Sequence, residues 1–143
     1  MTPGDAALRL VRRYYDEVVA GRDLAVRDEL FDPGFVGHSA GFGEFGLDAM
    51  RRSLEREQTV MPEDETVIEG QFAAGDRVVT RWRYRWKHER PVFGETPSGV
   101  WLEMEGAQIQ RVAGGKIVEL WEIKDRQGVM ERLGGRVVFP ESE

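Results

Sequence analysis

Apolar side chains recur at helical spacing in the first half of the chain. An apolar residue occurs every three or four positions over residues 3–20. Thr2 and Asp5 have the spacing of an N-terminal helix cap, so we expect a long first helix. The same reasoning predicts a shorter helix over residues 23–31 and a third helix over residues 47–61.

The link between the second and third helices is rich in turn residues. Asp32-Pro33-Gly34 predicts a turn that leads the chain out of the second helix. A short extended piece follows at Phe35–His38, and the glycine- and phenylalanine-rich stretch 41–46 is expected to be a loop.

From about residue 66 the apolar pattern changes from a period of 3.6 to a period of 2. This alternation predicts strands over residues 66–72, 78–88, 100–112 and 116–124, joined by short turns. We expect Gly106 to be the place of a β-bulge in the third of these strands. A short helix is predicted after the last strand.

The strand over residues 78–88 has two different faces. Trp82, Tyr84 and Trp86 alternate with a basic stripe, so the aromatic side chains point to one face and the basic ones to the other. A nucleic-acid surface needs both kinds on one face, so we predict no nucleic-acid partner. The basic stripe consists of Arg81, Arg83, Arg85 and Lys87. It is expected to pair with Glu103 and Glu105 and to mediate a homodimer through the sheet face.

Three helices followed by strands with short connections predict an α+β fold. The helices are expected to cover one face of a mostly antiparallel sheet, and a long curled sheet makes a cone with a pocket at its open end. We expect residues 1–143 to form a single domain, with a core over residues 7–134 and a tail at residues 135–143.

Composition restricts the chemistry that is available. The 143 residues carry a net charge of −6, contain no cysteine and include only two histidines, His38 and His88. Thiolate chemistry is therefore excluded, and no His-x-His or HExxH pattern indicates a metal site. The N-terminus lacks a secretion signal and no stretch is long and apolar enough for a membrane helix, so we expect a cytoplasmic protein without a membrane partner.

Several segments together resemble a known family. The chain contains, in order, FDPGFVGHS, AAGDRVVTRWRY, KHERPVFGETPSG, AQIQRVAGGKIVELWEIKD and LGG. These segments resemble the SnoaL-like polyketide cyclases, a branch of the NTF2-like superfamily, over about residues 7–134. The resemblance implies a cone-shaped NTF2-like fold and a cofactor-independent intramolecular aldol condensation on an apolar or polycyclic carbonyl substrate.

The resemblance also implies that Asp125, four residues after Trp121, is the general base of that reaction. If strand alternation continues, Asp125 shares a face with Ile117, Trp121 and Ile123, where burial would make it a stronger base. The alternative is that Asp125 only caps the final helix by accepting a hydrogen bond from a backbone N–H.

Other polar and aromatic residues are candidates for the same pocket. His38 and His88 each end an extended segment, and both could reach the mouth of a cone as catalytic hydrogen-bonding groups. The predicted substrate-binding residues are Gln110, Tyr14, Tyr15, Trp82, Trp86, Trp121, Phe42 and Phe45.

Two other classes of function stay open at this point, because one fold serves many activities. One is a related enzyme, such as a ketosteroid-isomerase-like isomerase or an epoxide hydrolase, which needs a further polar pair deep in the cone. The other is a non-catalytic ligand-binding or dimerisation module, in which the tryptophans fill the cone.

Overall fold

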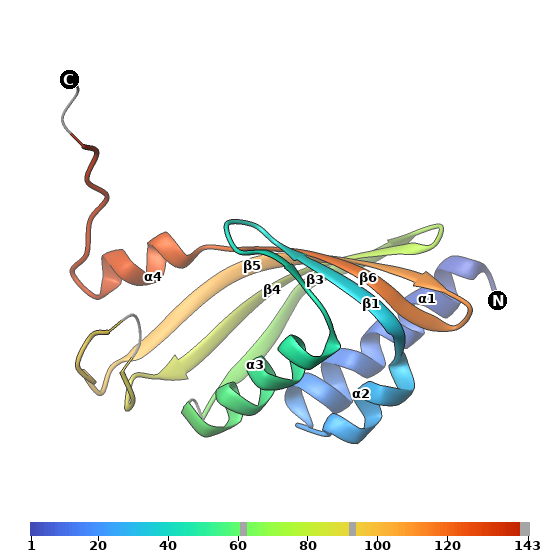
Figure 1. Cartoon of the computed structure of the whole chain (residues 1–143), viewed down its shortest axis with the longest axis horizontal. Coiled ribbons are helices and arrows are strands. Elements are labelled where there is room, and N and C mark those ends of the chain that lie inside the picture. Colours follow the sequence, from blue (N-terminus) through green and yellow to red (C-terminus); the bar gives the residue numbers. More distant parts are fainter. Residues whose placement is uncertain (61–62, 92–93, 141–143) are drawn as a thin grey trace.

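The computed structural model describes residues 1–60, 63–91 and 94–140, and its elements follow the predicted order of helices and strands (Figure 1). The helical elements are α1 (Pro3–Arg13), the π-helical segment η1 (Tyr14–Ala20), α2 (Leu24–Leu30), α3 (Leu47–Val60) and α4 (Arg126–Arg132). The strands are β1 (Phe31–Ser39), β2 (Gly43–Phe45), β3 (Glu65–Ala74), β4 (Arg77–Lys87), β5 (Trp101–Ala113) and β6 (Lys116–Lys124).

The described strands form one mixed sheet. Their order is β2-β1-β6-β5-β4-β3, with β1 parallel to β6 and every other pair antiparallel. Helices α1, α2 and α3 lie on one side of this sheet, whereas α4 lies at one end (Figure 1). The predicted α+β class is confirmed. We call the side toward α1–α3 the inner face and the opposite side the outer face.

The predicted capping residues fix where the first two helices begin. Thr2 accepts a hydrogen bond from the backbone N–H of Asp5, and the Asp5 side chain accepts one in return from the backbone of Thr2. Asp23 accepts hydrogen bonds from Ala25 and Val26 at the start of α2. Each cap satisfies backbone donors that have no partner within the helix.

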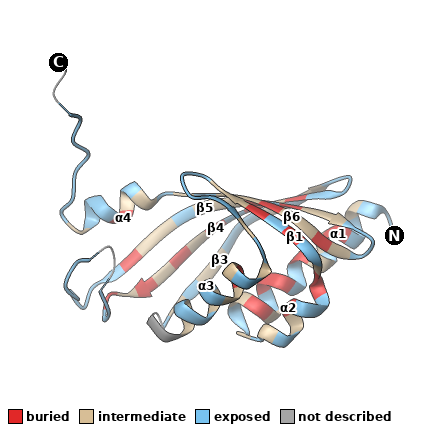
Figure 2. Ribbon diagram, viewed as in Figure 1, coloured by how far each residue is buried: buried red, intermediate tan, exposed pale blue. Residues whose placement is uncertain are grey.

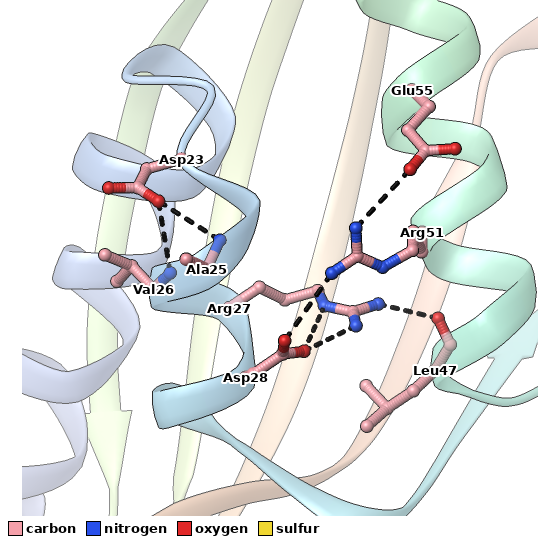
Figure 3. A network of polar contacts seen from close by, with 8 residues as sticks. All are labelled: Asp23, Ala25, Val26, Arg27, Asp28, Leu47, Arg51 and Glu55. Atoms are coloured by element: carbon pink, nitrogen blue, oxygen red, sulfur yellow. Dashed lines mark hydrogen bonds and ion pairs between the residues drawn. The ribbon is translucent and has the colours of Figure 1, made fainter.

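A polar network joins α2 to α3 (Figure 3). The buried Arg27 side chain donates to the Leu47 carbonyl at 2.7 Å and to the Asp28 carboxylate at 2.6 Å. Arg51 of α3 pairs with both Asp28 and Glu55. Because Arg27 bonds to the first residue of α3, the network fixes the position of α3 beneath the sheet.

The alternation predicted for β4 is confirmed. Its even-numbered side chains from Val78 to Trp86 are buried on the inner face, and Figure 2 shows buried positions along β4. On the outer face Arg83 and Arg85 pair with Glu103 at 3.7 and 3.0 Å, so the predicted cross-strand pairing with this glutamate is also confirmed.

The structure corrects two predictions about the link and the strand bulge. Asp32 to Gly34 lie within β1 instead of forming a turn, and part of the expected loop 41–46 is the strand β2. The β5 register is continuous past Gly106, so the bulge predicted there is wrong. Gly106 has a different role, because a Cβ atom there would lie 2.7 Å from the Ile123 carbonyl oxygen and collide with the Trp82 ring.

The irregularity lies instead in β6. Arg111 pairs with Glu119 but Val112 pairs with Ile117, so Val118 is an extra residue in the β5–β6 ladder. A bulge of this kind reverses which side chains reach which face. Ile117 and Leu120 are therefore both fully buried, although they are three residues apart.

The two ends of the molecule differ in how they pack. The larger core cluster lies between the helices and the sheet, whereas Trp82, Tyr84, Trp86 and Leu102 form a second cluster with Val129 of α4. The tail after α4 extends away from the sheet (Figure 1). Within the described ranges, no helix has the length and apolar content needed to cross a membrane.

Candidate functional site

A pocket of about 310 Å³ lies between α3 and the inner face of the sheet. This volume is at the lower end of the range for small-molecule sites. Its aromatic and apolar walls consist of Tyr14, Val19, Phe42, Phe45, Ala49, Met50, Leu54, Trp82, Met104 and Leu120. Its polar side chains are Tyr15, Ser39, Glu44, Ser53, Glu57, Thr66, Tyr84, Gln108, Glu122, Lys124 and Arg126. The pocket therefore combines an apolar wall with several ionisable groups.

The π-helical segment η1 supplies both tyrosines at the closed side of the pocket. The backbone N–H of Gly21 bonds to the Asp16 carbonyl, five residues earlier, which is the hydrogen bond of a π-helix. Tyr14 and Tyr15 are adjacent in sequence, and both are buried and line the pocket. Burial raises the pKa of the Tyr15 hydroxyl above its ordinary value, so this group stays a neutral donor.

A chain of hydrogen bonds leads from Tyr15 to Glu122. The Tyr15 hydroxyl donates to Gln108 Oε1, and Gln108 Nε2 donates to Glu122 Oε2 at 2.7 Å. Lys124 Nζ lies 2.9 Å from the other oxygen, Glu122 Oε1. Gln110 stands behind this chain, and its Nε2 donates to the Tyr15 hydroxyl at 2.9 Å. Both oxygens of Glu122 therefore have donors.

A second carboxylate, that of Asp64, is held beside the pocket. Its Oδ1 lies 2.6 Å from the Arg22 guanidinium, and its Oδ2 accepts a hydrogen bond of 2.6 Å from the Tyr84 hydroxyl. Arg22 has a positive φ of 58°, a conformation that non-glycine residues seldom adopt. Asp64 is thus fixed by one charged and one neutral donor.

Glu57 is a further acidic group in this region and differs from Glu122 and Asp64. Within the described ranges, no hydrogen bond or ion pair of its carboxyl group is found. Burial raises the pKa of Glu57 to about 7, an effect that Lys124 and Arg22 oppose and the negative charges of Asp64 and Glu122 reinforce. The group therefore changes its protonation near neutral pH.

Five of the predicted site residues line the pocket: Tyr14, Tyr15, Trp82, Phe42 and Phe45. Phe45 lies across Gly37 of the neighbouring strand, where a Cβ atom would collide with its ring. The Phe42 ring is covered by the Arg126 guanidinium at 4.0 Å.

The structure places Asp125 differently from the strand-parity prediction. The β6 bulge turns Leu120, Glu122 and Lys124 toward the pocket, so the expectation that Asp125 lies on the same apolar face as Ile117 is wrong. Its exposed carboxylate accepts a hydrogen bond of 2.9 Å from the backbone N–H of Gly128 and caps α4. Asp125 is not among the residues that line the described pocket.

His38 and Trp121 lie on the outer face of the sheet. Their rings stack at 5.5 Å, and His38 Nε2 lies 2.7 Å from Glu119 Oε2. The same Glu119 carboxylate also pairs with Arg111 at 3.1 Å. Neither ring reaches the pocket that the structure describes, so neither contributes to its lining.

His88 and Trp86 are buried at the far end of β4. Trp86 belongs to the cluster with Leu102 and Val129. The backbone N–H of Ser98 donates to His88 Nδ1 at 3.2 Å, which assigns the ring proton of a neutral imidazole to Nε2. Both side chains lie outside the lining of the pocket in the described structure.

Sequence reasoning missed Glu57, although a signal was present. Met50, Ser53, Leu54 and Glu57 fall at positions i, i+3, i+4 and i+7 of α3 and all line the pocket. The charged neighbours of Glu57 in the sequence make that segment look like a solvated helix surface. Glu122 was missed because the bulge changes its face.

A family model for the SnoaL-like polyketide cyclases matches residues 9–133 of the chain. The chain belongs to this family. The resemblance inferred from the sequence is thereby confirmed, and the family supports a cyclase-like function. Among curated proteins, none matches the chain significantly.

Solved structures of this family share the fold. IdmH from Streptomyces antibioticus, provisionally a polyketide cyclase, is 26% identical, with a TM-score of 0.79 over 90% of this chain and 99% of that chain. A protein from Jannaschia sp. CCS1, provisionally a SnoaL-like polyketide cyclase, is 22% identical, with a TM-score of 0.83 over 96% and 97% of the two chains.

The same fold also carries another activity. An LEH-like epoxide hydrolase from M. tuberculosis is 17% identical to the chain and has a TM-score of 0.69, with 90% of this chain and 89% of that chain covered. Likeness at this identity shows the NTF2-like fold alone. The reaction must therefore be argued from the pocket.

Proposed function

We propose that this SnoaL-like protein is a cofactor-independent enzyme that closes a ring in an apolar carbonyl compound by an intramolecular aldol-type addition. A carboxylate removes a proton from a carbon next to a carbonyl group, and the resulting enolate carbon attacks a second carbonyl of the same molecule. The new alkoxide oxygen then takes up the proton. The step forms one carbon–carbon bond and requires no oxidant, reductant or second substrate.

The observation that carries this proposal is the coexistence of apolar walls and ionisable groups in one pocket. Tyr14, Phe45 and Trp82 give wide apolar contact for a flat or polycyclic molecule. Lys124 supplies a positive charge for the developing enolate oxygen. Holding both carbonyl groups of one chain in this space favours ring closure over reaction with another molecule.

An open pocket also argues for the enzyme over the non-catalytic alternative. That alternative predicts a cone filled by tryptophans, whereas Trp82 forms a wall of the cavity and Trp86 packs away from it. The family resemblance assigns the base to Asp125, and the positions of His38 and His88 at the ends of extended segments make them candidate hydrogen-bonding partners. Because Asp125 caps α4 outside the pocket lining, the proposed reaction does not depend on it. If the Asp125→Asn variant retains turnover, Asp125 takes no part in the reaction.

The proposal is tested by proton exchange with aromatic ketones and aryl β-keto esters as probes. In D₂O we expect the wild-type protein to catalyse deuterium uptake at the carbon next to the carbonyl, above the buffer rate, measured by NMR. Exchange should saturate with probe concentration and be inhibited by a bulky polycyclic phenol. If the wild-type protein does not raise the exchange rate of any probe above the rate in buffer, the proposal is refuted.

We further propose that the protein forms a homodimer through the outer face of the sheet. This face carries exposed or half-buried apolar side chains on β3, β5 and β6, namely Phe72, Ile109, Trp121 and Ile123, and Val79 of β4 lies between Phe72 and Ile109. Large apolar side chains in neighbouring positions are typical of protein interfaces. We expect light scattering after gel filtration to give twice the chain mass, and Ile123→Glu to give the monomer mass. A wild-type monomer at all concentrations would contradict the dimer.

A further inference from the structure

We infer that Glu57 is the catalytic residue that exchanges the proton with the substrate, while the carboxylates of Glu122 and Asp64 serve as fixed negative charges. The inference rests on the proposed function, whose proton-transfer group it names. It concerns a residue on α3, far along the chain from the Asp125 position that the family resemblance indicates.

The position of Glu57 follows from the helix that carries it. Met50, Leu54 and Glu57 lie on one stripe of α3 and all line the pocket. The network around Arg27 bonds the first residue of α3 to α2 and so anchors the start of this helix (Figure 3). The carboxyl group of Glu57 therefore lies on the wall that faces a bound molecule.

The hydrogen-bonding partners separate the three acidic groups. Each oxygen of Glu122 has a donor, from Gln108 and Lys124. Each oxygen of Asp64 likewise has one, from Arg22 and Tyr84. A carboxylate whose oxygens already accept these hydrogen bonds has fewer lone pairs free for a substrate proton. Glu44 also lines the pocket, but its side chain is 74% exposed and lies 3.8 Å from His38 Nδ1. Among the described acidic residues of the lining, Glu57 is the one that is partly buried and has no such donors, so its lone pairs are available to a substrate proton.

Charged and titratable groups face Glu57 from each neighbouring element. Glu122 and Lys124 come from β6, Tyr84 comes from β4, and Asp64 and Arg22 come from the segments before β3 and after η1. The charge of Glu57 also contributes, after burial, to the raised pKa of Tyr14 in η1. Their opposing charges, together with burial, place the pKa of Glu57 at about 7. A base with this pKa gives and takes protons readily at neutral pH.

In the reaction, the Glu57 carboxylate removes the proton from the carbon next to the substrate carbonyl, and the electron pair of that C–H bond becomes the enolate. Lys124 compensates the negative charge on the enolate oxygen. After the carbon–carbon bond has formed, protonated Glu57 returns its proton to the alkoxide oxygen. The carboxyl group ends in its starting state, so each turnover is balanced without a cofactor.

The test compares Glu57→Gln with Glu55→Gln in the exchange assay described above. Glu55 lies on the same helix but pairs with Arg51 outside the pocket lining, so the same substitution there is the matched control. We expect Glu57→Gln to lower the exchange rate by about 100-fold or more and Glu55→Gln to leave it unchanged. Glu57→Asp should retain part of the activity with a shifted pH profile.

A second readout reports the ionisation of Glu57 without any substrate. Carbon-13 NMR of protein labelled at the glutamate carboxyl groups should contain one signal with a midpoint near pH 7 that is missing from Glu57→Gln. Unchanged exchange in Glu57→Gln, with a wild-type protein that is active, would overturn the inference and leave the proposed function standing. A wild-type protein with no exchange would refute the proposed function itself.

Discussion

The two faces of the sheet use the same strands in opposite ways. On the outer face several charged side chains are paired, since Arg85 lies 3.0 Å from Glu103 and Arg111 lies 3.1 Å from Glu119. On the inner face the charged groups lie beside aromatic rings in one pocket, and Glu57 opposes that face without a partner of its own in the described structure. Paired charges on a wet surface contribute little to reactivity, whereas an unpaired buried carboxyl group is a source of proton transfer.

The largest expected contrast between the faces is in tryptophan packing. Trp82 is 6% exposed and packs on the inner face, whereas Trp121 is only partly buried on the outer face. We expect Trp82→Ala to lower the free energy of unfolding by about 3–5 kcal/mol and Trp121→Ala by about 1 kcal/mol, measured by urea denaturation. Equal losses would show that the two faces do not differ in packing.

The next effect comes from the ionisation of Glu57, and here the substitution is expected to raise the free energy of unfolding instead of lowering it. Its pKa is about 7 in the folded protein against the ordinary value of 4.5, so the folded state binds more protons than the unfolded state between these values. Stability therefore falls as the pH rises from about 4.5 to 7, by roughly 3 kcal/mol in total. Glu57→Gln removes this loss and should be more stable than wild type at pH 8.

At pH 4 the same variant should have nearly wild-type stability, because the carboxyl group is then mostly protonated in both states. Thermal melts of wild type, Glu57→Gln and Glu55→Gln across this pH range measure the difference. A Glu57→Gln variant that is less stable than wild type at pH 8 would mean that the charged carboxylate has partners in the folded protein. If Glu57→Gln is more stable than wild type but has lost exchange activity, the loss of activity does not come from a folding defect.

A smaller effect is expected at Gly106, where the backbone closely approaches the inner-face ring of Trp82. A Cβ atom at Gly106 would lie 2.7 Å from both the Ile123 carbonyl oxygen and a ring carbon of Trp82. Gly106→Ala should therefore destabilise the protein by about 1–3 kcal/mol. Gly70 of β3 is the control, since a Cβ atom there meets nothing within 4 Å. Equal effects at both glycines would disprove the close contact.

The sequence predicts most of the helices and strands because their signals are local. The capping pair Thr2 and Asp5 and the alternation through Trp82 depend only on neighbouring residues. The β6 bulge depends on pairing with two other strands at once, so no local pattern reveals it. The face assignment of Asp125 was wrong for that reason. Glu57 becomes recognisable only when the helical stripe from Met50 is extended into a charged segment.

Asp125 itself supplies a prediction of about 1 kcal/mol. Its carboxylate accepts the hydrogen bond of the Gly128 backbone N–H, so Asp125→Ala should lower stability by about 1 kcal/mol through loss of the N-cap. Asp125→Asn keeps an acceptor oxygen and should have nearly wild-type stability. Chemical denaturation measures the stability of both variants. A large loss of stability with both substitutions would indicate that the charge has a role beyond capping.

The smallest effect is expected on the outer face, at the ion pair between Arg85 and Glu103. The side chains are 36% and 33% exposed, so water screens their attraction and a double-mutant cycle should give a coupling below about 1 kcal/mol. The coupling should weaken further at high salt, because the charges are accessible to ions. Stability that falls by several kcal/mol in Glu103→Gln, and falls more on dilution, would instead mean that the proposed dimer interface extends beyond its apolar patch and buries this pair. The outer face would then resemble the inner one, and its charges would have to be explained by the dimer interface.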